Sequence, residues 1–159
     1  MAEQGRPDEG VALIRTVLDS AATLGLPANV ETLRVSSEAQ ARTGQLEEAL
    51  AAIEQAFTAV GEQQILLPGV LWQRGELHLM RGEETLADRD FRETITVSRR
   101  MSSKAYELRA TTSLARLLAK QGKGDEGRAM LGETYNWFTE GFDTADLKDA
   151  KALLDELDA

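Results

Sequence analysis

Apolar residues recur along this chain at helical spacing, in segments separated by short polar turns that contain glycine. Positions three and four apart share one face of a helix, so this pattern predicts amphipathic α-helices. Asn29, Ser103 and Asp125 are expected N-caps, and Pro68 suits a first helical turn. The predicted helices cover about residues 8–25, 29–43, 46–61, 68–81, 84–101, 104–121, 125–138 and 145–157.

The segments repeat with a period of about 39 residues. "EQGRPDEGVALI", "RTGQLEEALAAI", "MRGEETLADRDF" and "KQGKGDEGRAML" align on their first glycines, Gly5, Gly44, Gly82 and Gly122, which lie 39, 38 and 40 residues apart. A glycine at this place tolerates the left-handed backbone that ends one helix before the next begins. The period therefore predicts repeated helical hairpins.

Small residues mark the expected contact between the two helices of each hairpin. Seven residues before the last three glycines stand Ser37, Gly75 and Ala115, and five residues after the four glycines stand Gly10, Ala49, Ala87 and Gly127. A bulky apolar residue follows four positions later, at Ile14, Ile53, Phe91 and Leu131. Small residues on facing helices let the backbones approach closely, and the bulky residue fills the neighbouring gap.

This skeleton resembles the tetratricopeptide repeat, although Gln40, His78 and Leu118 replace its usual tyrosine and the period exceeds the usual 34 residues. The resemblance implies an all-α, right-handed superhelical stack of antiparallel hairpins. We expect one domain over residues 1–159, with a half repeat at 1–25, repeats at about 28–65, 66–102 and 103–138, and a capping helix at about 144–158.

Helix 8–25 has the sequence of a second hairpin helix without its first. Its apolar residues cover too much surface for one shallow contact; they are Val11, Leu13, Ile14, Val17, Leu18, Ala21 and Leu24. A repeat cannot bury its apolar face alone. Either the chain has been cut from a longer array or a second copy covers this end as a homodimer.

The stretch from "GVLWQRGELHLMRG" through "FRETITVSRR" to "AKALLDEL" resembles the C-terminal repeats of large bacterial regulators. In that family an adenylate/guanylate cyclase-like or DNA-binding module and a predicted ATPase precede a long tetratricopeptide-type tail. The resemblance implies a regulatory or scaffolding tail, with the family's chemistry lying upstream of the residues present here.

Charge and composition narrow the possible partners. The net charge is −9, and a basic middle at residues 68–122 (+3) lies between two acidic ends (−6 each). This balance argues against a nucleic-acid binder. "SRRMSSK" at 98–104 is explained by cations complementing a helix C-terminus. Cysteine is absent, and no apolar run suits a signal peptide or membrane span, which favours a soluble, cytoplasmic protein.

Catalytic chemistry has little support in the sequence. His78 is the only histidine, it falls mid-helix, and we expect it to serve in packing. The spacing of Asp143, Asp146, Asp149 and Asp155 is helical and does not match a calcium loop. We therefore expect no enzyme activity, no cofactor and no metal.

The inner face of the first hairpin helices is the candidate binding surface, since solenoids bind partners in such a groove. The residues expected on this face were chosen by their distance in sequence from each turn glycine. They are Arg34, Glu38, Arg42, Trp72, Glu76, Leu79, Met80, Arg109, Thr112, Arg116 and Lys120. A tryptophan among several cations suits an acidic peptide. The alternative is structural: Glu76 pairs with Arg109 or Arg116 while Trp72 is packed between helices.

Half of the eight aromatic residues lie between Tyr135 and Phe142. We interpret them as a plug between the last hairpin and the capping helix. The residues assigned to this cap are Trp137, Phe138, Phe142, Leu147 and Leu154.

The sequence thus predicts a non-catalytic module for protein–protein interaction or self-association, as the C-terminal segment of a multidomain signalling protein. The alternative is a regulatory domain that binds a small anionic effector in the groove.

Overall fold

The computed structural model describes residues 7–25 and 29–159, and within them every regular element is helical. Each predicted helix is present, with bounds that differ from the prediction by at most three residues. The elements are α1 (Pro7–Thr23), α2 (Val30–Arg42), α3 (Leu46–Ala59), the 3-10 helix η1 (Gln64–Leu66), α4 (Leu67–Met80), α5 (Glu84–Arg100), α6 (Lys104–Lys120), α7 (Gly124–Tyr135) and α8 (Ala145–Asp158).

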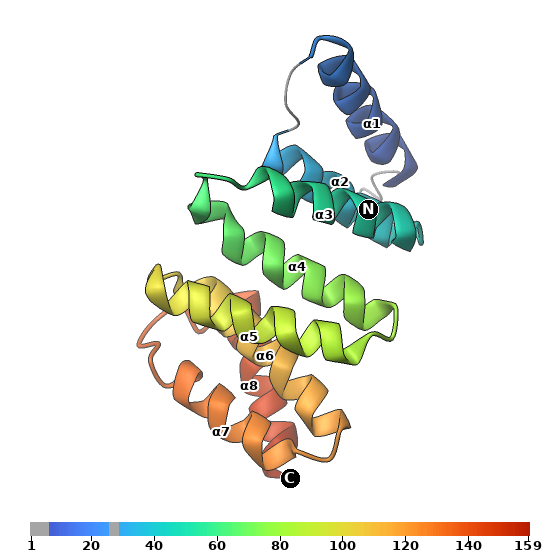
Figure 1. The fold of residues 1–159 in the computed structure, drawn as a ribbon. Helices are drawn as coiled ribbons and strands as arrows, with labels where there is room; N and C mark the ends of the chain where they lie inside the picture. The colour runs from blue at the N-terminus through green and yellow to red at the C-terminus, as the bar shows by residue number, and fades with distance from the viewer. Residues whose placement is uncertain (1–6, 26–28) are drawn as a thin grey trace.

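Consecutive helices form antiparallel hairpins that stack in one direction (Figure 1). The hairpins α2–α3, α4–α5 and α6–α7 follow one another from blue to orange, and the contacts of α3 with α4 and of α5 with α6 join them. Helix α1 packs against α2 at one end, and α8 packs against α6 and α7 at the other. The fold is a helical repeat solenoid, as predicted.

Left-handed glycines form the turn inside each hairpin. Gly44, Gly82 and Gly122 have φ angles of 79°, 83° and 78°. The residue after each glycine donates its N–H to a carbonyl five positions earlier at 2.8 Å, from Gln45 to Gln40, from Glu83 to His78 and from Lys123 to Leu118. This repeated bond closes each first helix before the second begins. The fourth aligned glycine, Gly5, lies outside the described residues.

The two helices of each hairpin meet where the small residues were predicted. In the first hairpin the Ser37 hydroxyl donates to the Ala49 carbonyl at 2.8 Å, a direct contact of side chain with backbone. In the second, a Cβ on Gly75 would lie 2.7 Å from the Phe91 ring, which is fully buried. A side chain on Gly75, or a larger one than serine at position 37, would force the helices apart.

The third hairpin repeats this arrangement, but its glycine lies on the second helix of the hairpin instead of the first. A Cβ on Gly127 would lie 2.9 Å from the Ala115 carbonyl oxygen, so α6 and α7 are in backbone contact there. The bulky residues predicted one turn further, Ile53 and Leu131, are fully buried like their counterpart in α5.

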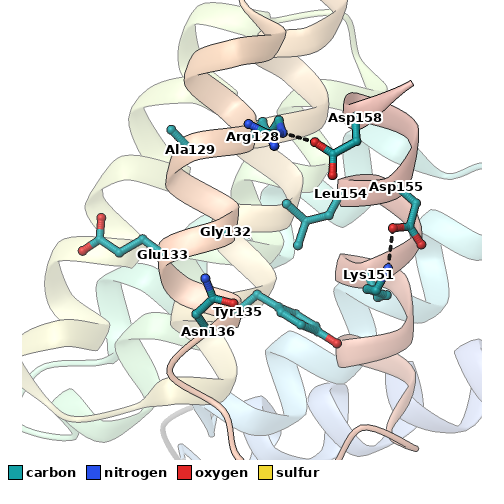
Figure 2. A pocket seen from close by; sticks show the side chains of 10 residues that line it. All are labelled: Arg128, Ala129, Gly132, Glu133, Tyr135, Asn136, Lys151, Leu154, Asp155 and Asp158. Carbon is teal, nitrogen blue, oxygen red and sulfur yellow. Dashed lines mark hydrogen bonds and ion pairs between the residues drawn. The ribbon is translucent and has the colours of Figure 1, made fainter.

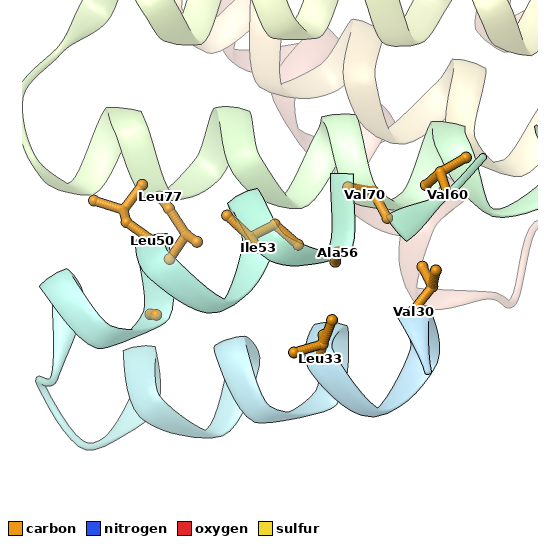
Figure 3. Close-up of a cluster of buried hydrophobic side chains, with 9 residues drawn as sticks. Val30, Leu33, Leu50, Ile53, Ala56, Val60, Val70 and Leu77 are labelled. Carbon is orange, nitrogen blue, oxygen red and sulfur yellow. The ribbon is translucent and has the colours of Figure 1, made fainter. Parts of the chain in front are cut away.

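Three apolar clusters follow one another along the stack. The first joins α2, α3 and α4 (Figure 3), and it consists of Val30, Leu33, Ala49, Leu50, Ile53, Ala56, Val60, Val70 and Leu77. The second lies between α5 and α6, and the third joins α6 and α7 to α8. Each hairpin therefore buries its apolar face against a neighbour.

A buried ion pair fixes α4 onto α5. The Arg74 guanidinium donates from Nε and Nη2 to the two carboxylate oxygens of Asp90 at 2.7 and 2.8 Å, and Asp90 is fully buried. The same guanidinium lies 4.2 Å from the Phe57 ring centroid in α3. Burial lowers the pKa of Arg74, but the hydrogen bonds to Asp90 together with the charges of Asp90, Glu54 and Glu93 outweigh it, so the pKa is raised and the charge is retained. This pair orients the helix that carries Trp72.

The three predicted N-caps behave differently. The Asn29 side chain accepts the N–H of Glu31 at 2.8 Å, so this cap is confirmed. Ser103 occupies the N-cap position of α6 without a side-chain bond to the helix. The prediction for Asp125 is wrong, because α7 begins one residue earlier and its N-cap is Lys123.

The predicted aromatic plug is correct only in part. Phe138 and Leu154 pack partly buried against the third cluster, of which Leu147 is a buried member. Trp137 is 58 % exposed and Phe142 46 % exposed, so neither fills the gap under the capping helix. Helix α7 ends three residues earlier than predicted, and the chain carries Trp137 out of the helix. There its ring faces the ammonium group of Lys104 at 4.9 Å.

We predict that Gly75→Ala destabilises the protein by about 1–3 kcal/mol, because the added methyl group overlaps the buried Phe91 ring. Gly132→Ala is the matched control: Gly132 also lies in a helix but its added methyl group meets nothing within 4 Å. Helix propensity predicts that the control gains up to about 1 kcal/mol. Urea unfolding followed by circular dichroism measures both. Equal effects at the two sites would contradict the close contact.

A candidate groove along the first hairpin helices

The first helices of the three hairpins lie side by side and are joined by polar contacts. Gln73 of α4 donates to the Arg34 carbonyl of α2 at 2.8 Å, and Arg34 donates to the Gln73 side chain at 3.1 Å. Trp72 of α4 donates from Nε1 to the Ser113 hydroxyl of α6 at 3.2 Å. Arg109 of α6 donates to Asp146 of α8 at 2.8 Å. These helices form one continuous surface, with α8 in the place of a fourth first helix.

Trp72 lies at the centre of this surface. Its ring is half-buried and packs against the cluster between α5 and α6. The Arg109 guanidinium lies 5.5 Å from the Trp72 ring centroid and 5.2 Å from that of Tyr106. Trp72 is therefore held by packing, by the bond to Ser113 and by a cation–π contact, which leaves it a rigid apolar wall.

Two hollows adjoin this tryptophan, and we call them together the groove. The first has a volume of about 400 Å³ and is lined by Arg34, Glu38, Trp72, Gln73, Glu76, Leu77, Arg109 and Asp146. The second has a volume of about 160 Å³ and is lined by Trp72, Glu76, Arg109, Thr112, Ser113, Arg116, Asp146 and Asp149. Both hollows share Trp72, Glu76, Arg109 and Asp146, so the groove extends across α2, α4, α6 and α8.

The basic side chains predicted for this surface are already paired with carboxylates. Arg109 pairs with Asp146 at 2.8 Å, and Arg116 pairs with Asp149. The other pairs are Arg34 with Glu31 at 3.0 Å, Arg42 with Glu38 at 2.6 Å, and Lys120 with Glu84 at 2.6 Å. The expected pairing of Glu76 with Arg109 or Arg116 does not form, because α8 supplies both partners.

Glu76 differs from the other carboxylates of the groove. It is mostly buried, and its carboxylate accepts the Ser113 hydroxyl. Across residues 7–25 and 29–159, no basic side chain lies within 4 Å of it. Burial raises the pKa of Glu76 above its usual value of 4.5, although Ser113 and the more distant Arg116 partly oppose this. A carboxylate held in this way costs the folded protein stability.

Some predicted residues lie outside the two hollows. Met80 is 59 % exposed, and neither it nor Arg42 or Lys120 lines the groove. Leu79 packs against the cluster between α5 and α6. The residues that the fold brings together as predicted are Arg34, Glu38, Trp72, Glu76, Arg109, Thr112 and Arg116.

Sequence reasoning missed the contribution of α8 and several polar neighbours. From the sequence, Asp146 and Asp149 were recognised only by their helical spacing and not as groove residues, yet they line the groove. The given sequence contains no turn glycine by which α8 can be aligned with the other first helices, so its register relative to them could not be read from the sequence. Ser113 and Gln73 directly follow the predicted residues Thr112 and Trp72 in the sequence. Only the packing shows that they face the groove.

A separate cleft lies between α7 and α8 (Figure 2). Its volume is about 440 Å³, and Leu154 and Tyr135 lie between the two helices. Ion pairs of Arg128 with Asp158 and of Lys151 with Asp155 border it. Its charged groups are largely satisfied by one another, and it contains none of the predicted groove residues. The groove is therefore the stronger candidate.

His78 has a structural environment. It is 6 % exposed, and its Nδ1 lies 2.7 Å from a carboxylate oxygen of Glu83. Its Nε2 lies 3.8 Å from Asp90 of the buried ion pair. In the described part of the chain, no cluster of three or more His, Cys, Asp or Glu side chains could hold a metal ion.

None of the helices that the structure describes has the length and apolar character needed to cross a bilayer.

Comparison with known proteins identifies the type of repeat. A family profile for the tetratricopeptide repeat matches residues 32–55 and 108–133, within the first and third hairpins. No curated protein sequence matches the chain. Among solved structures, TPR-like repeats of kinesin light chain type from Podosopora anserina superpose with a TM-score of 0.77 at 16 % identity, over 98 % of this chain and 79 % of the other.

A second solved structure, MamA, superposes with a TM-score of 0.66 at 18 % identity, over 97 % of this chain and 84 % of the other. At these identities the likeness concerns the fold. With the family match, it shows that the chain contains a tetratricopeptide-type repeat region. Repeats of this type generally mediate protein–protein interaction or scaffolding and are typically non-catalytic.

We predict that Glu76→Gln leaves the unfolding free energy at pH 7 equal to or above that of the wild type. Gln retains an oxygen for the Ser113 hydroxyl and removes the desolvated charge. Glu107→Gln is the matched control, since Glu107 is buried but bonded to Arg99 at 2.8 Å and Lys104 at 2.7 Å. The control should lose about 1.5–3 kcal/mol.

The two variants should also differ in their pH dependence. The pKa of Glu76 is raised, so the wild type should lose stability relative to Glu76→Gln as the pH rises from 4.5 through that pKa. Burial would raise the pKa of Glu107, but Lys104 and Arg99 lower it overall. The stability that Glu107 contributes should therefore be present above pH 4.5 and lost as the pH falls through its lowered pKa. Guanidinium unfolding between pH 3 and 8 measures both, and identical profiles would refute the assignment.

Proposed function

We propose that this protein is a non-catalytic interaction module that binds a protein segment in the groove. The observation that carries the proposal is the continuous groove across α2, α4, α6 and α8, in which rigidly held Trp72 adjoins two hollows. A half-buried aromatic side chain among hydrogen-bonding groups is typical of the anchor point of a peptide site. The extended inner face of stacked helical repeats suits such a partner.

The pairing of the groove arginines disfavours the alternative, a small anionic effector. Such a ligand would have to displace Asp146 or Asp149 from Arg109 or Arg116 before gaining a charge partner. A peptide can instead bind across the paired groups through its backbone and apolar side chains.

We further propose that the repeats form the C-terminal regulatory or scaffold segment of a cytoplasmic bacterial signalling protein. The resemblance of residues 68–157 to the tail of cyclase-like regulators supports this role. The genomic reading frame tests it: the frame should continue upstream of Met1 into cyclase-like or ATPase sequence. A stop codon directly before Met1 would contradict it.

Self-association through α1 is the alternative to cover of this helix by upstream repeats. Leu13 is 67 % exposed and Val17 50 % exposed on this helix, and both belong to the apolar set predicted to need cover. A second copy that packs against this helix would remove them from water.

We predict that Trp72→Ala weakens binding of a peptide selected for binding to this protein by at least about tenfold, as expected for a central aromatic anchor. The peptide is first selected from a phage-displayed library of random 16-residue sequences on the immobilised protein. Isothermal titration calorimetry then compares the variants. Ile65→Ala is the matched control, because Ile65 is 78 % exposed on η1 outside the groove, and it should bind like the wild type. Equal loss in both variants, or no selected peptide, would count against the groove.

If a second copy covers α1, the double variant Leu13→Glu and Val17→Glu should be monomeric while the wild type is dimeric, because charges on the α1 face prevent its burial. Sedimentation velocity at several concentrations measures the mass. A monomeric wild type would refute self-association through this helix.

A further inference from the structure

The charge of the groove is opposite to that expected from its arginines. Its two hollows are lined by three guanidinium groups, Arg34, Arg109 and Arg116, and by four carboxylates, Glu38, Glu76, Asp146 and Asp149. Because each arginine has a carboxylate within 4 Å, its charge is largely neutralised before any ligand arrives. A ligand therefore encounters a slightly acidic surface.

The excess negative charge is concentrated on Glu76. Glu38 is paired with Arg42, and Asp146 and Asp149 are paired with arginines of α6. Only Glu76 among the four lacks a cation within 4 Å in the described part of the chain, and it lines both hollows. Its single bond from the Ser113 hydroxyl leaves acceptor positions on the carboxylate free.

An arriving cation would gain more at Glu76 than at any other carboxylate of the groove. The carboxylate is already desolvated by the fold, which is the reason for its raised pKa, so the cost of burying it has been met in the free protein. The neighbouring Trp72 ring offers an apolar wall for the methylene stem of a long basic side chain.

We propose that the groove recognises a basic peptide segment, in which one lysine or arginine places its charged group on the Glu76 carboxylate and its stem along Trp72. This inference rests on the proposed function and specifies its partner class. It replaces the acidic peptide suggested by the sequence with a basic one, because carboxylates of α8 neutralise Arg109 and Arg116 and Glu31 neutralises Arg34.

The test uses the same phage-displayed random library on the full chain. Sequences selected by the wild type should share a lysine or arginine at one position. The selected peptide is then synthesised with lysine, norleucine or glutamate there, and the three affinities are measured by calorimetry. Replacing lysine by norleucine, which keeps the stem and removes the charge, should weaken binding at least about tenfold, and glutamate should weaken it further.

A variant of the protein tests whether Glu76 causes this preference for lysine. In Glu76→Gln the preference for lysine over norleucine should fall below about threefold. Glu48→Gln is the matched control, because Glu48 is an exposed carboxylate on α3 that lines neither hollow, and it should keep the full preference. Circular dichroism establishes that each variant is folded.

The outcomes separate this inference from the proposed function. Selected peptides that lack a shared basic residue, or that are rich in acidic residues, would overturn the inference while supporting peptide binding in the groove. An unchanged lysine preference in Glu76→Gln would overturn the assignment to that carboxylate. The absence of any selected peptide would overturn the proposed function and the inference with it.

Discussion

The close approach of the two helices in each hairpin is the constraint on which the rest of this structure depends. At Gly75 and Gly127 the space for a side chain is taken by the facing helix, and at Ser37 the hydroxyl bonds directly to the facing backbone. Contact at this distance fixes the register of each hairpin, because a shift would place a larger residue in the narrow gap. It also buries the bulky residues one turn further.

The fixed register explains why a groove exists at all. Arg34 and Trp72 lie ten residues before their turn glycines and Ser113 lies nine before its own, so the fixed register places Trp72 beside Arg34 on one side and Ser113 on the other. The buried pair of Arg74 and Asp90 ties α4 to α5. The tryptophan is therefore positioned by the packing of its neighbours.

The electrostatics of the groove depend on α8. In the place where a further repeat would begin, this helix turns two aspartates toward the arginines of α6. The positive surface expected from the middle of the sequence becomes a neutral to acidic one. Glu76 has no cation within 4 Å among the residues that the structure describes, and the folded protein carries the cost of its desolvation. Buried groups that reduce stability are common at functional sites.

The sequence by itself determined the repeat period, the helices to within three residues, the hairpin contacts and most of the groove residues, because each follows from spacing relative to a turn glycine. Only the tertiary structure decided which charges meet. Asp146 and Asp149 lie on a helix with no glycine to set its register, and Trp137 is exposed because α7 ends earlier than its pattern suggests. Local spacing specifies the face of a helix, whereas ion pairing depends on where distant helices lie in space.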